Sequence, residues 1–192
     1  MSELILERLF DSPVRVKLLK FFIHNGARPY TLNEIIQFTQ CRSRETRMEL
    51  ERLATVGLIR HRKTRVPSYE TNQGFVFLAE LRSLVTKSSP ASKERMFERL
   101  KRMGQIKLAV LSGIFVNADN SKADLLIVGD GISEGRLSQF FRDLEAEVGR
   151  ELDYVVLSSK EFQYRNSMYD RFIRDIMERP HEKLIDRLEV NK

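Results

Sequence analysis

Cysteine and histidine are scarce in this chain, and each shortage removes a class of chemistry. The single cysteine, Cys41, has no partner for an intramolecular disulfide. The three histidines, His24, His61 and His181, lie far apart and do not have the spacing of metal ligands. We therefore predict no metal site and no catalytic histidine.

Long apolar runs are also missing. No run approaches the roughly 20 apolar residues that span a bilayer. The first residues, Met1–Leu4, are acidic and lack the basic start and cleavage site of a signal peptide. With 42% hydrophobic and 31% charged residues, the composition is that of a globular chain rather than a disordered one. We expect a cytoplasmic protein with no membrane partner.

Basic charge is concentrated in the N-terminal half. Residues 1–72 carry 13 Lys and Arg against 8 Asp and Glu, and residues 73–104 carry 7 against 3. Residues 105–192 carry 13 against 16. Because a positive field attracts polyanions and speeds their encounter, the N-terminal half is predicted to meet one.

Capping signals divide residues 10–72 into three predicted helices and a hairpin. The first helix runs from Ser12-Pro13 to Asn25-Gly26. Thr31 begins the second, with Glu34 completing a capping box. The third begins at Ser43 and ends at Gly57. The hairpin then consists of a strand beginning at Leu58-Ile59, a basic turn over Arg60–Arg65 and a return strand over Ser68–Thr71.

Residues 43–59, SRETRMELERLATVGLI, are similar to the recognition helix of winged helix-turn-helix transcriptional regulators, including its Leu-x-x-Leu-x-x-x-Gly-Leu-Ile ending. In such modules the third helix lies in the major groove of double-stranded DNA, and the hairpin contacts the backbone or the minor groove. The resemblance implies DNA contacts from the third helix and its start (Arg42, Ser43, Arg44, Arg47) and from the hairpin (Arg60, Arg62, Lys63, Arg65).

Two other interpretations of this half remain open. In the first, the acidic residues Glu45, Glu49 and Glu51 of the same helix pair with the arginines at helical spacing. The basic face is then a neutralised surface that contacts only solvent. Winged helices also serve as assembly modules, so protein–protein contact is the second alternative.

The middle of the chain contains a predicted dimerisation helix. Residues Gly74–Thr86 form a helix with apolar residues on more than one side, which favours packing on its own domain and on a second subunit. Ser88–Ser92 is a linker, and Lys93–Met103 is a strongly basic helix. We predict a homodimer whose chain divides into a DNA-binding domain (1–87), a linker (88–93) and a C-terminal domain (94–192).

The C-terminal domain alternates strands and helices, which indicates an α+β fold with a small mixed sheet. The predicted strands are Ile106–Leu111, Ala123–Val128 and Leu152–Leu157. The predicted helices are Ser133–Gly149 and Ser159–Met177, and Leu184–Leu188 closes the domain.

Two segments of this domain, Ser112-Gly113-Ile114 and Lys122–Val128, resemble the Gly-Ser and Asp-x-Asp signature of minimal nucleotidyltransferases over residues 94–188. The resemblance implies a small mixed-sheet domain of that fold. Gly113 matches the glycine, Asp124 matches the second aspartate and Asp153 the third carboxylate. Ile114 replaces the serine and Lys122 replaces the first aspartate. Because a lysine repels the metal ion that the first aspartate binds, two-metal phosphoryl transfer is not expected.

The sequence therefore predicts a DNA-binding transcriptional regulator. Its second domain has no catalytic residues, needs no cofactor and serves dimerisation, effector sensing or partner binding. Gly113, Lys122, Asp124 and Asp153 remain candidate nucleotide-binding residues, with Lys122 contacting phosphate of a nucleotide effector. Asp119 is a candidate substitute ligand. Alternatively, Asp124 and Asp153 merely begin strands at a sheet edge. Another interpretation is an active nucleotidyltransferase that uses Mg²⁺ and a nucleoside triphosphate to modify a protein or small acceptor, with Asp124 and Asp153 as the metal ligands. A third is an antitoxin-like module.

Overall fold

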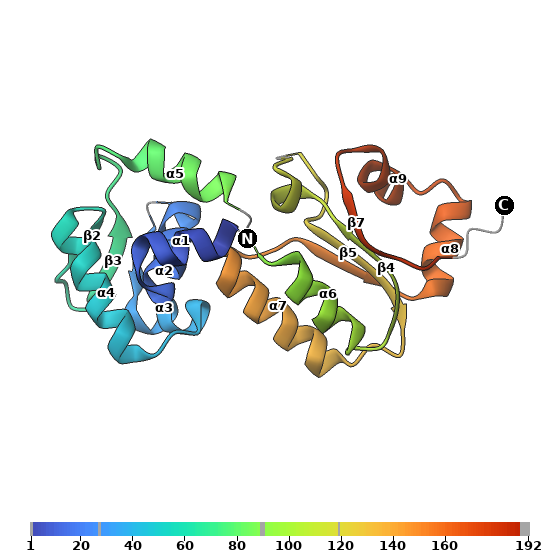
Figure 1. Cartoon of the computed structure of the whole chain (residues 1–192), viewed down its shortest axis with the longest axis horizontal. Coiled ribbons are helices and arrows are strands. Elements are labelled where there is room, and N and C mark those ends of the chain that lie inside the picture. The colour runs from blue at the N-terminus through green and yellow to red at the C-terminus, as the bar shows by residue number, and fades with distance from the viewer. Residues whose placement is uncertain (1, 27, 89–90, 119, 189–192) are drawn as a thin grey trace. The chain divides into compact units, whose positions relative to one another are not determined.

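The computed structural model describes residues 2–26, 28–88, 91–118 and 120–188, and the fold is a mixture of helices and two small sheets (Figure 1). Contacts divide the chain into two compact units. Unit 1 is Met1–Pro90 with Arg142–Glu151, and unit 2 is Ala91–Phe141 with Leu152–Lys192. The chain thus returns to unit 1 over Arg142–Glu151, which the sequence segmentation into 1–87, 88–93 and 94–192 does not anticipate. Among the described residues, no helix has both the length and the apolar character needed to cross a membrane.

Unit 1 consists of helices around a small sheet. Its elements are α1 (Ser2–Phe10), α2 (Pro13–Asn25), β1 (Tyr30–Thr31), α3 (Leu32–Thr39), α4 (Ser43–Val56), β2 (Ile59–Arg62), β3 (Ser68–Thr71) and α5 (Leu78–Lys87). The predicted caps are present. Ser12 Oγ accepts a hydrogen bond from Arg15 N–H at 3.1 Å, and Thr31 and Glu34 form the reciprocal capping box. Gly57, with φ of 86°, ends α4.

The sheet of unit 1 is antiparallel, with strand order β1-β3-β2. Ile59 pairs with Thr71 in the hairpin, and Tyr30 pairs with Tyr69 on the other side of β3. The two-residue strand β1 is too short to show a period, so the sequence does not reveal it. The core below the sheet is apolar and combines α2, α3, α4 and β2, with Leu18, Phe21, Phe22, Ile35, Leu50, Leu53, Leu58 and Ile59 buried.

Two predicted boundaries in unit 1 are wrong. The hairpin turn is shorter than Arg60–Arg65, because β2 extends to Arg62. Helix α5 begins at Leu78 rather than at Gly74. The Asn72 side chain explains the delay: its amide donates to Gly57 O at 2.8 Å and its oxygen accepts from Gly74 N–H at 3.2 Å, which holds the segment before α5 as a turn.

Unit 2 is built on a four-stranded mixed sheet. Its elements are α6 (Lys93–Lys101), β4 (Gln105–Leu111), the 3₁₀ turn η1 (Gly113–Val116), β5 (Leu125–Asp130), the greater part of α7 (Glu134–Val148), β6 (Tyr154–Leu157), α8 (Ser159–Ser167), α9 (Arg171–Glu178) and β7 (Glu182–Asp186). The strand order is β6-β5-β4-β7. Only β5 and β6 pair in parallel, so the sheet is mixed, as predicted.

The late part of unit 2 departs from the sequence prediction. The single helix predicted over Ser159–Met177 is two helices, α8 and α9. Tyr169 takes a left-handed φ of 54°, and the Asp170 carboxylate then caps α9 by accepting the N–H groups of Phe172 and Ile173. The closing segment is the edge strand β7, which pairs with β4.

Candidate nucleic-acid interface

The first turns of α4 present the predicted DNA-contacting residues at the surface of unit 1. Arg42, Ser43, Arg44 and Arg47 are all exposed. The opposite side of the helix is anchored in the core by Leu50 and Leu53, and the Thr46 hydroxyl donates to Arg42 O at 3.0 Å. Arg42 is the N-cap residue and its side chain makes no capping hydrogen bond. The N-terminal N–H groups of α4 are therefore without a side-chain cap, and a positive dipole end faces outward.

Arg44 and Arg47, on the exposed face of α4, are not paired with the acidic residues of the same helix. Within the described part of the chain, neither Arg44 nor Arg47 forms an ion pair, and Arg42 lies at 3.9 Å from Glu45 with both side chains exposed. Such an exposed pair contributes little to stability. The charge of Arg44 and Arg47 is thus available to a ligand.

Glu49, by contrast, is committed to the interior of unit 1. Its carboxylate accepts hydrogen bonds from Arg15 Nε of α2 at 2.7 Å and from Arg52 Nη1 at 2.8 Å. Burial raises the pKa of Glu49, but the hydrogen bonds and charges of Arg15 and Arg52 outweigh it, so that the pKa lies below its usual value. Glu49 therefore fastens α4 to α2 rather than screening Arg44 and Arg47.

The β2–β3 hairpin carries the second group of predicted contacts. Arg60, Lys63 and Arg65 are exposed and form no ion pair with any described residue. Arg62 differs, because its guanidinium binds the Glu70 carboxylate at 2.8 Å. Three of the four basic hairpin residues are thus available, and Arg62 is partly neutralised.

An aromatic stack stiffens the hairpin. His61 and Tyr69, directly opposite each other on β2 and β3, have ring centroids 4.5 Å apart and nearly parallel planes. Desolvation raises the pKa of Tyr69, with Glu51 adding to the rise and Arg47 opposing it. The two charges come from α4, so the hairpin and the helix lie close enough to interact electrostatically. The sequence gives no sign of this stack, because His61 and Tyr69 meet only through strand pairing.

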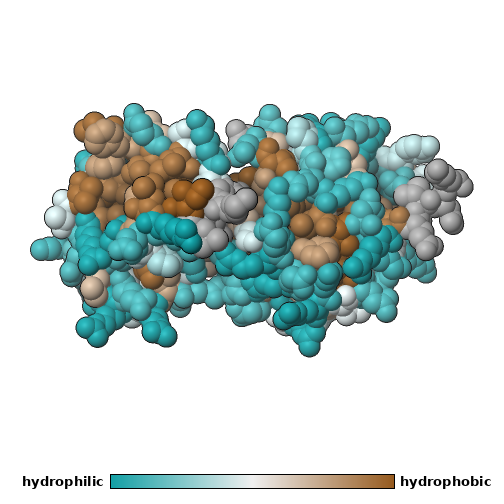
Figure 2. All heavy atoms as spheres, viewed as in Figure 1, coloured by the Kyte–Doolittle hydropathy of each residue, from teal (hydrophilic) through white to brown (hydrophobic). Residues whose placement is uncertain are grey.

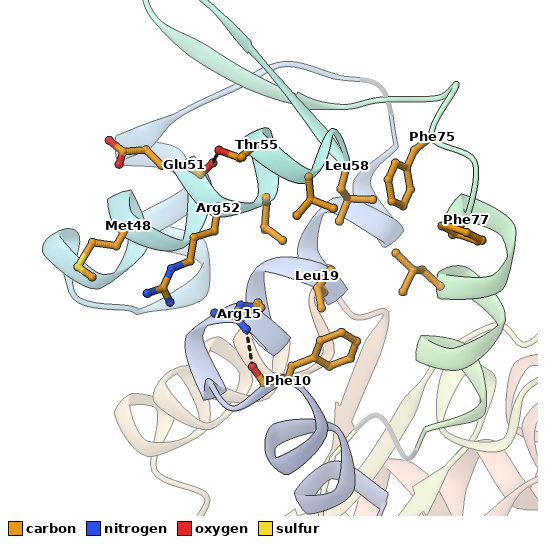
Figure 3. Close-up of a pocket in the computed structure, with 13 residues that line it drawn as sticks. Phe10, Arg15, Leu19, Met48, Glu51, Arg52, Thr55, Leu58, Phe75 and Phe77 are labelled. Atoms are coloured by element: carbon orange, nitrogen blue, oxygen red, sulfur yellow. Dashed lines mark hydrogen bonds between the residues drawn. The ribbon is translucent and has the colours of Figure 1, made fainter.

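An apolar groove of about 890 Å³ lies beside α4 (Figure 3). It is bounded by α1, α2, α4, α5 and the turn before α5. Its apolar lining is Phe10, Leu19, Met48, Leu53, Val56, Leu58, Phe75, Phe77 and Leu81. Val56 and Phe77 are 66% and 59% exposed. Figure 2 shows apolar residues gathered over this part of unit 1. Unit 1 therefore exposes a group of neighbouring apolar side chains to water, as surfaces that bind another protein do.

In unit 2, Asp124 is buried and engaged by the backbone. It is 4% exposed, and its two carboxylate oxygens accept hydrogen bonds from Ile114 N–H at 2.9 Å and Asp153 N–H at 3.1 Å. Gly113, with φ of 55°, lies so close that a Cβ there would overlap the Asp124 carboxylate. Asp124 thus ties the η1 turn and the start of β6 to β5.

The other candidate nucleotide-binding residues do not gather around Asp124 as ligands. Lys122 and Asp153 are exposed at neighbouring strand starts, and Asp153 meets Asp124 through its backbone N–H. Asp119 lies outside the described residues. In the described ranges no group of three or more His, Cys, Asp or Glu residues is placed to hold a metal ion. The geometry here is that of a turn, η1, stabilised by the Asp124 carboxylate.

A further group of basic residues has no counterpart in the predicted sites. Arg99 and Arg102, at the end of α6, and Arg136, on the first turn of α7, line one hollow of unit 2. The basic character of α6 is visible in the sequence, but the contribution of α7 depends on the fold.

Comparisons of the chain with protein-family models, curated proteins and solved structures found no match.

Proposed function

We propose that unit 1 is a winged helix-turn-helix module that binds double-stranded DNA and that the protein is a DNA-binding transcriptional regulator. The order α2-β1-α3-α4-β2-β3, with a helix leading into an antiparallel hairpin, supports this proposal. A helix exposed on one side and followed directly by a basic hairpin has the form needed to enter a major groove while the hairpin contacts the backbone.

The observation that carries the proposal is the state of Arg44 and Arg47. Both are exposed on the first turns of α4, and neither is paired with a described carboxylate. Arginine in that position can engage the O6 and N7 atoms of guanine with two hydrogen bonds or hold a phosphate. A solvated, self-neutralised face would instead have Glu45, Glu49 and Glu51 paired with these arginines, whereas Glu49 is held by Arg15 and Arg52.

DNA binding is tested with the full chain and a pool of random-sequence duplexes, by fluorescence anisotropy at several salt concentrations. We expect binding that weakens steeply with salt, because phosphate contacts release counterions. The variant Arg44→Gln/Arg47→Gln should lose at least tenfold in affinity. Arg171→Gln, which removes an exposed arginine from α9, is the matched control and should bind as the wild type does. Absence of any duplex binding at low salt would remove the proposal.

For unit 2 we propose a nucleotidyltransferase-like domain without catalytic activity that senses an effector or binds a partner. The engagement of both Asp124 oxygens by backbone N–H groups supports a structural use of the one carboxylate that matches the Asp-x-Asp signature. Incubation with labelled nucleoside triphosphate and Mg²⁺ should label neither the protein nor added DNA. Labelling that disappears in Asp124→Asn would favour the enzyme instead.

We also propose that the protein is a homodimer and that a second copy of the chain covers the apolar groove beside α4. The exposed Val56 and Phe77 at its rim support this occupant, since burying them against a like surface removes apolar area from water on both copies. Sedimentation equilibrium should give a dimer at micromolar concentration, and Val56→Glu/Phe77→Glu should give a monomer that keeps its helical circular dichroism. A wild-type chain that sediments only as a monomer would contradict the dimer.

A further inference from the structure

Unit 2 has a basic hollow that belongs neither to the DNA-contacting residues of unit 1 nor to the surroundings of Asp124. It has a volume of about 650 Å³ and is lined by Arg99, Arg102, Met103, Arg136, Gln139 and Phe140. Three of these six side chains are guanidinium groups, and no carboxylate is among them. The volume falls within the range of small-molecule sites, roughly 300–1,000 Å³.

The backbone holds the two sides of this hollow together. Ser133 N–H, just before α7, donates to Met103 O at 3.0 Å, just after α6, and the two helices lie beside each other in Figure 1. The turn at Gly104 allows this approach, because a Cβ there would lie 2.8 Å from Gly131 O. Arg136 Nη1 donates to Arg102 O at 2.6 Å and so satisfies a carbonyl at the end of α6. The Arg136 guanidinium is therefore held against the end of α6 by the fold.

The charges around the hollow are unbalanced. The segment Lys93–Arg102 contains five basic residues and two acidic ones, Glu94 and Glu98. Glu98 forms an ion pair with Lys101, with Oε1 and Nζ 3.5 Å apart. Glu134 is exposed at the start of α7. Arg99 and Gln139 have further partners within the protein, so the charges that matter most are those of Arg102 and Arg136. The Arg102 side chain forms no ion pair or hydrogen bond with any residue that the structure describes.

The floor of the hollow is apolar. Phe140 is 1% exposed and Met103 is 4% exposed, and the Arg99 guanidinium lies over the Phe140 ring at 5.2 Å. Because Phe140 is covered, its face is not free to stack a base. Recognition is thus confined to the anionic group.

From these observations we propose that the hollow between α6 and α7 is a binding site for phosphate groups, held by Arg102 and Arg136 with Arg99 beside them. Forked guanidinium donors match the oxygens of a phosphate, and neighbouring like charges are relieved when an anion lies between them. The phosphate belongs either to a free oligophosphate, such as the tail of a nucleotide, or to a nucleic-acid backbone. In both cases the identity of the base is irrelevant.

The direct test is isothermal titration of the full chain with inorganic pyrophosphate. The wild type should bind, and Arg102→Gln/Arg136→Gln should bind at least tenfold more weakly, while Arg171→Gln on α9 keeps the wild-type affinity. Arg102→Gln alone leaves every described hydrogen bond in place, so it should weaken binding without changing the thermal unfolding midpoint. The Arg44→Gln/Arg47→Gln variant of unit 1 should bind pyrophosphate normally, which separates this site from the DNA-binding proposal.

A second titration identifies the source of the phosphate. In the Arg44→Gln/Arg47→Gln background, adding the two unit 2 substitutions either reduces residual binding of duplex DNA, which assigns the hollow to a nucleic-acid backbone, or leaves it unchanged while pyrophosphate binding is lost, which assigns it to a free phosphate. No pyrophosphate binding by the wild type at millimolar concentration would overturn the proposal. Equal pyrophosphate affinity in wild type and double variant, or equal affinity for sulfate and pyrophosphate, would overturn it as well.

Discussion

Arg15 of α2 and Glu49 of α4 form a two-point ion pair, with Nε and Oε2 2.7 Å apart and Nη2 and Oε1 3.3 Å apart. Arg15 Nη1 also donates to Phe10 O at 2.6 Å, at the end of α1. One guanidinium therefore joins α1, α2 and α4. The orientation of the exposed arginine face on α4 depends on this joint, because Glu49 lies on the same helix as Arg44 and Arg47.

Replacing Glu49 with glutamine should destabilise unit 1. The variant leaves Arg15, whose side chain is 25% exposed, without its carboxylate. A partly buried, charge-assisted pair of this kind corresponds to about 1–3 kcal/mol of unfolding free energy. Urea denaturation followed by circular dichroism measures the loss, and Glu45→Gln, at an exposed position on the same helix, should change stability by less than about 0.5 kcal/mol.

The contribution of the Arg15–Glu49 ion pair to stability should depend on pH, and the direction of this dependence follows from the pKa of Glu49. Because the pKa of Glu49 is lowered in the folded state, its contribution is fully present above the pKa of the unfolded chain and is lost as the pH falls through the folded value. The difference in stability between wild type and Glu49→Gln should therefore shrink in acid. A difference that stays constant down to pH 3 would contradict an ionic role for this carboxylate.

Hairpin and helix residues should separate in their effect on DNA binding. The hairpin variant Arg60→Gln/Lys63→Gln/Arg65→Gln removes cations that would face the DNA backbone in the proposed complex, so it should weaken binding to all duplexes alike. The slope of log K against log salt should fall by about 1 for each phosphate that is no longer neutralised. Arg47→Gln on α4 should instead flatten the preference among sequences selected from the random pool. Equal loss of sequence preference in both variants would contradict this division of roles.

The local elements of unit 1 followed from its sequence, because caps and turns are local chemistry. Ser12, Thr31 with Glu34, and Gly57 each determine a helix end through contacts within a few residues, and those ends are where they were predicted. The partners of Glu49 were not predictable in this way. Arg15 lies 34 residues away and meets Glu49 only when α2 packs on α4.

Unit 2 was less predictable for the same reason. The alternation of strands and helices indicated the mixed sheet. The strand β7 was not predictable, because its partner β4 lies far away in the sequence and the short segment Glu182–Asp186 shows little strand periodicity. The Asp124 carboxylate matched a catalytic signature by spacing. Its two backbone donors, which give it a structural role, come from η1 and from the start of β6 and have no sequence signal.

Asp124→Ala should therefore act on stability. The substitution leaves the Ile114 and Asp153 N–H groups without an acceptor in a partly buried region, which corresponds to about 1–3 kcal/mol of unfolding free energy. Asp153→Ala removes an exposed side chain while keeping the backbone donor, so it is the matched control and should be nearly neutral. The measurement is thermal unfolding with and without Mg²⁺. A wild-type midpoint that rises with Mg²⁺, and does so only when Asp124 is intact, would show that the carboxylate holds metal.

His24 on α2 should make unit 1 sensitive to mild acid. Burial lowers its pKa from 6.5 to about 4, and the nearby positive charges of Arg150, Lys20 and Arg82 act in the same direction. Well above pH 6.5 the side chain is neutral in both states and contributes no pH dependence. As the pH falls below 6.5, His24 is protonated in the unfolded chain but stays neutral in the folded chain. The free energy of unfolding therefore falls, by about 2 kcal/mol at pH 5.

Urea unfolding at pH 7, 6 and 5 measures this effect in the wild type and in His24→Gln, which cannot take up the proton. The wild type should lose stability over that interval and the variant should lose much less. His181→Gln, which changes a histidine of unit 2, is the control and should retain the wild-type slope. Carboxylates with lowered pKa values, such as Glu49, lose their contribution mainly below pH 5, so the interval isolates the histidine. Parallel curves for wild type and His24→Gln would show that the folded state accommodates the charged imidazole.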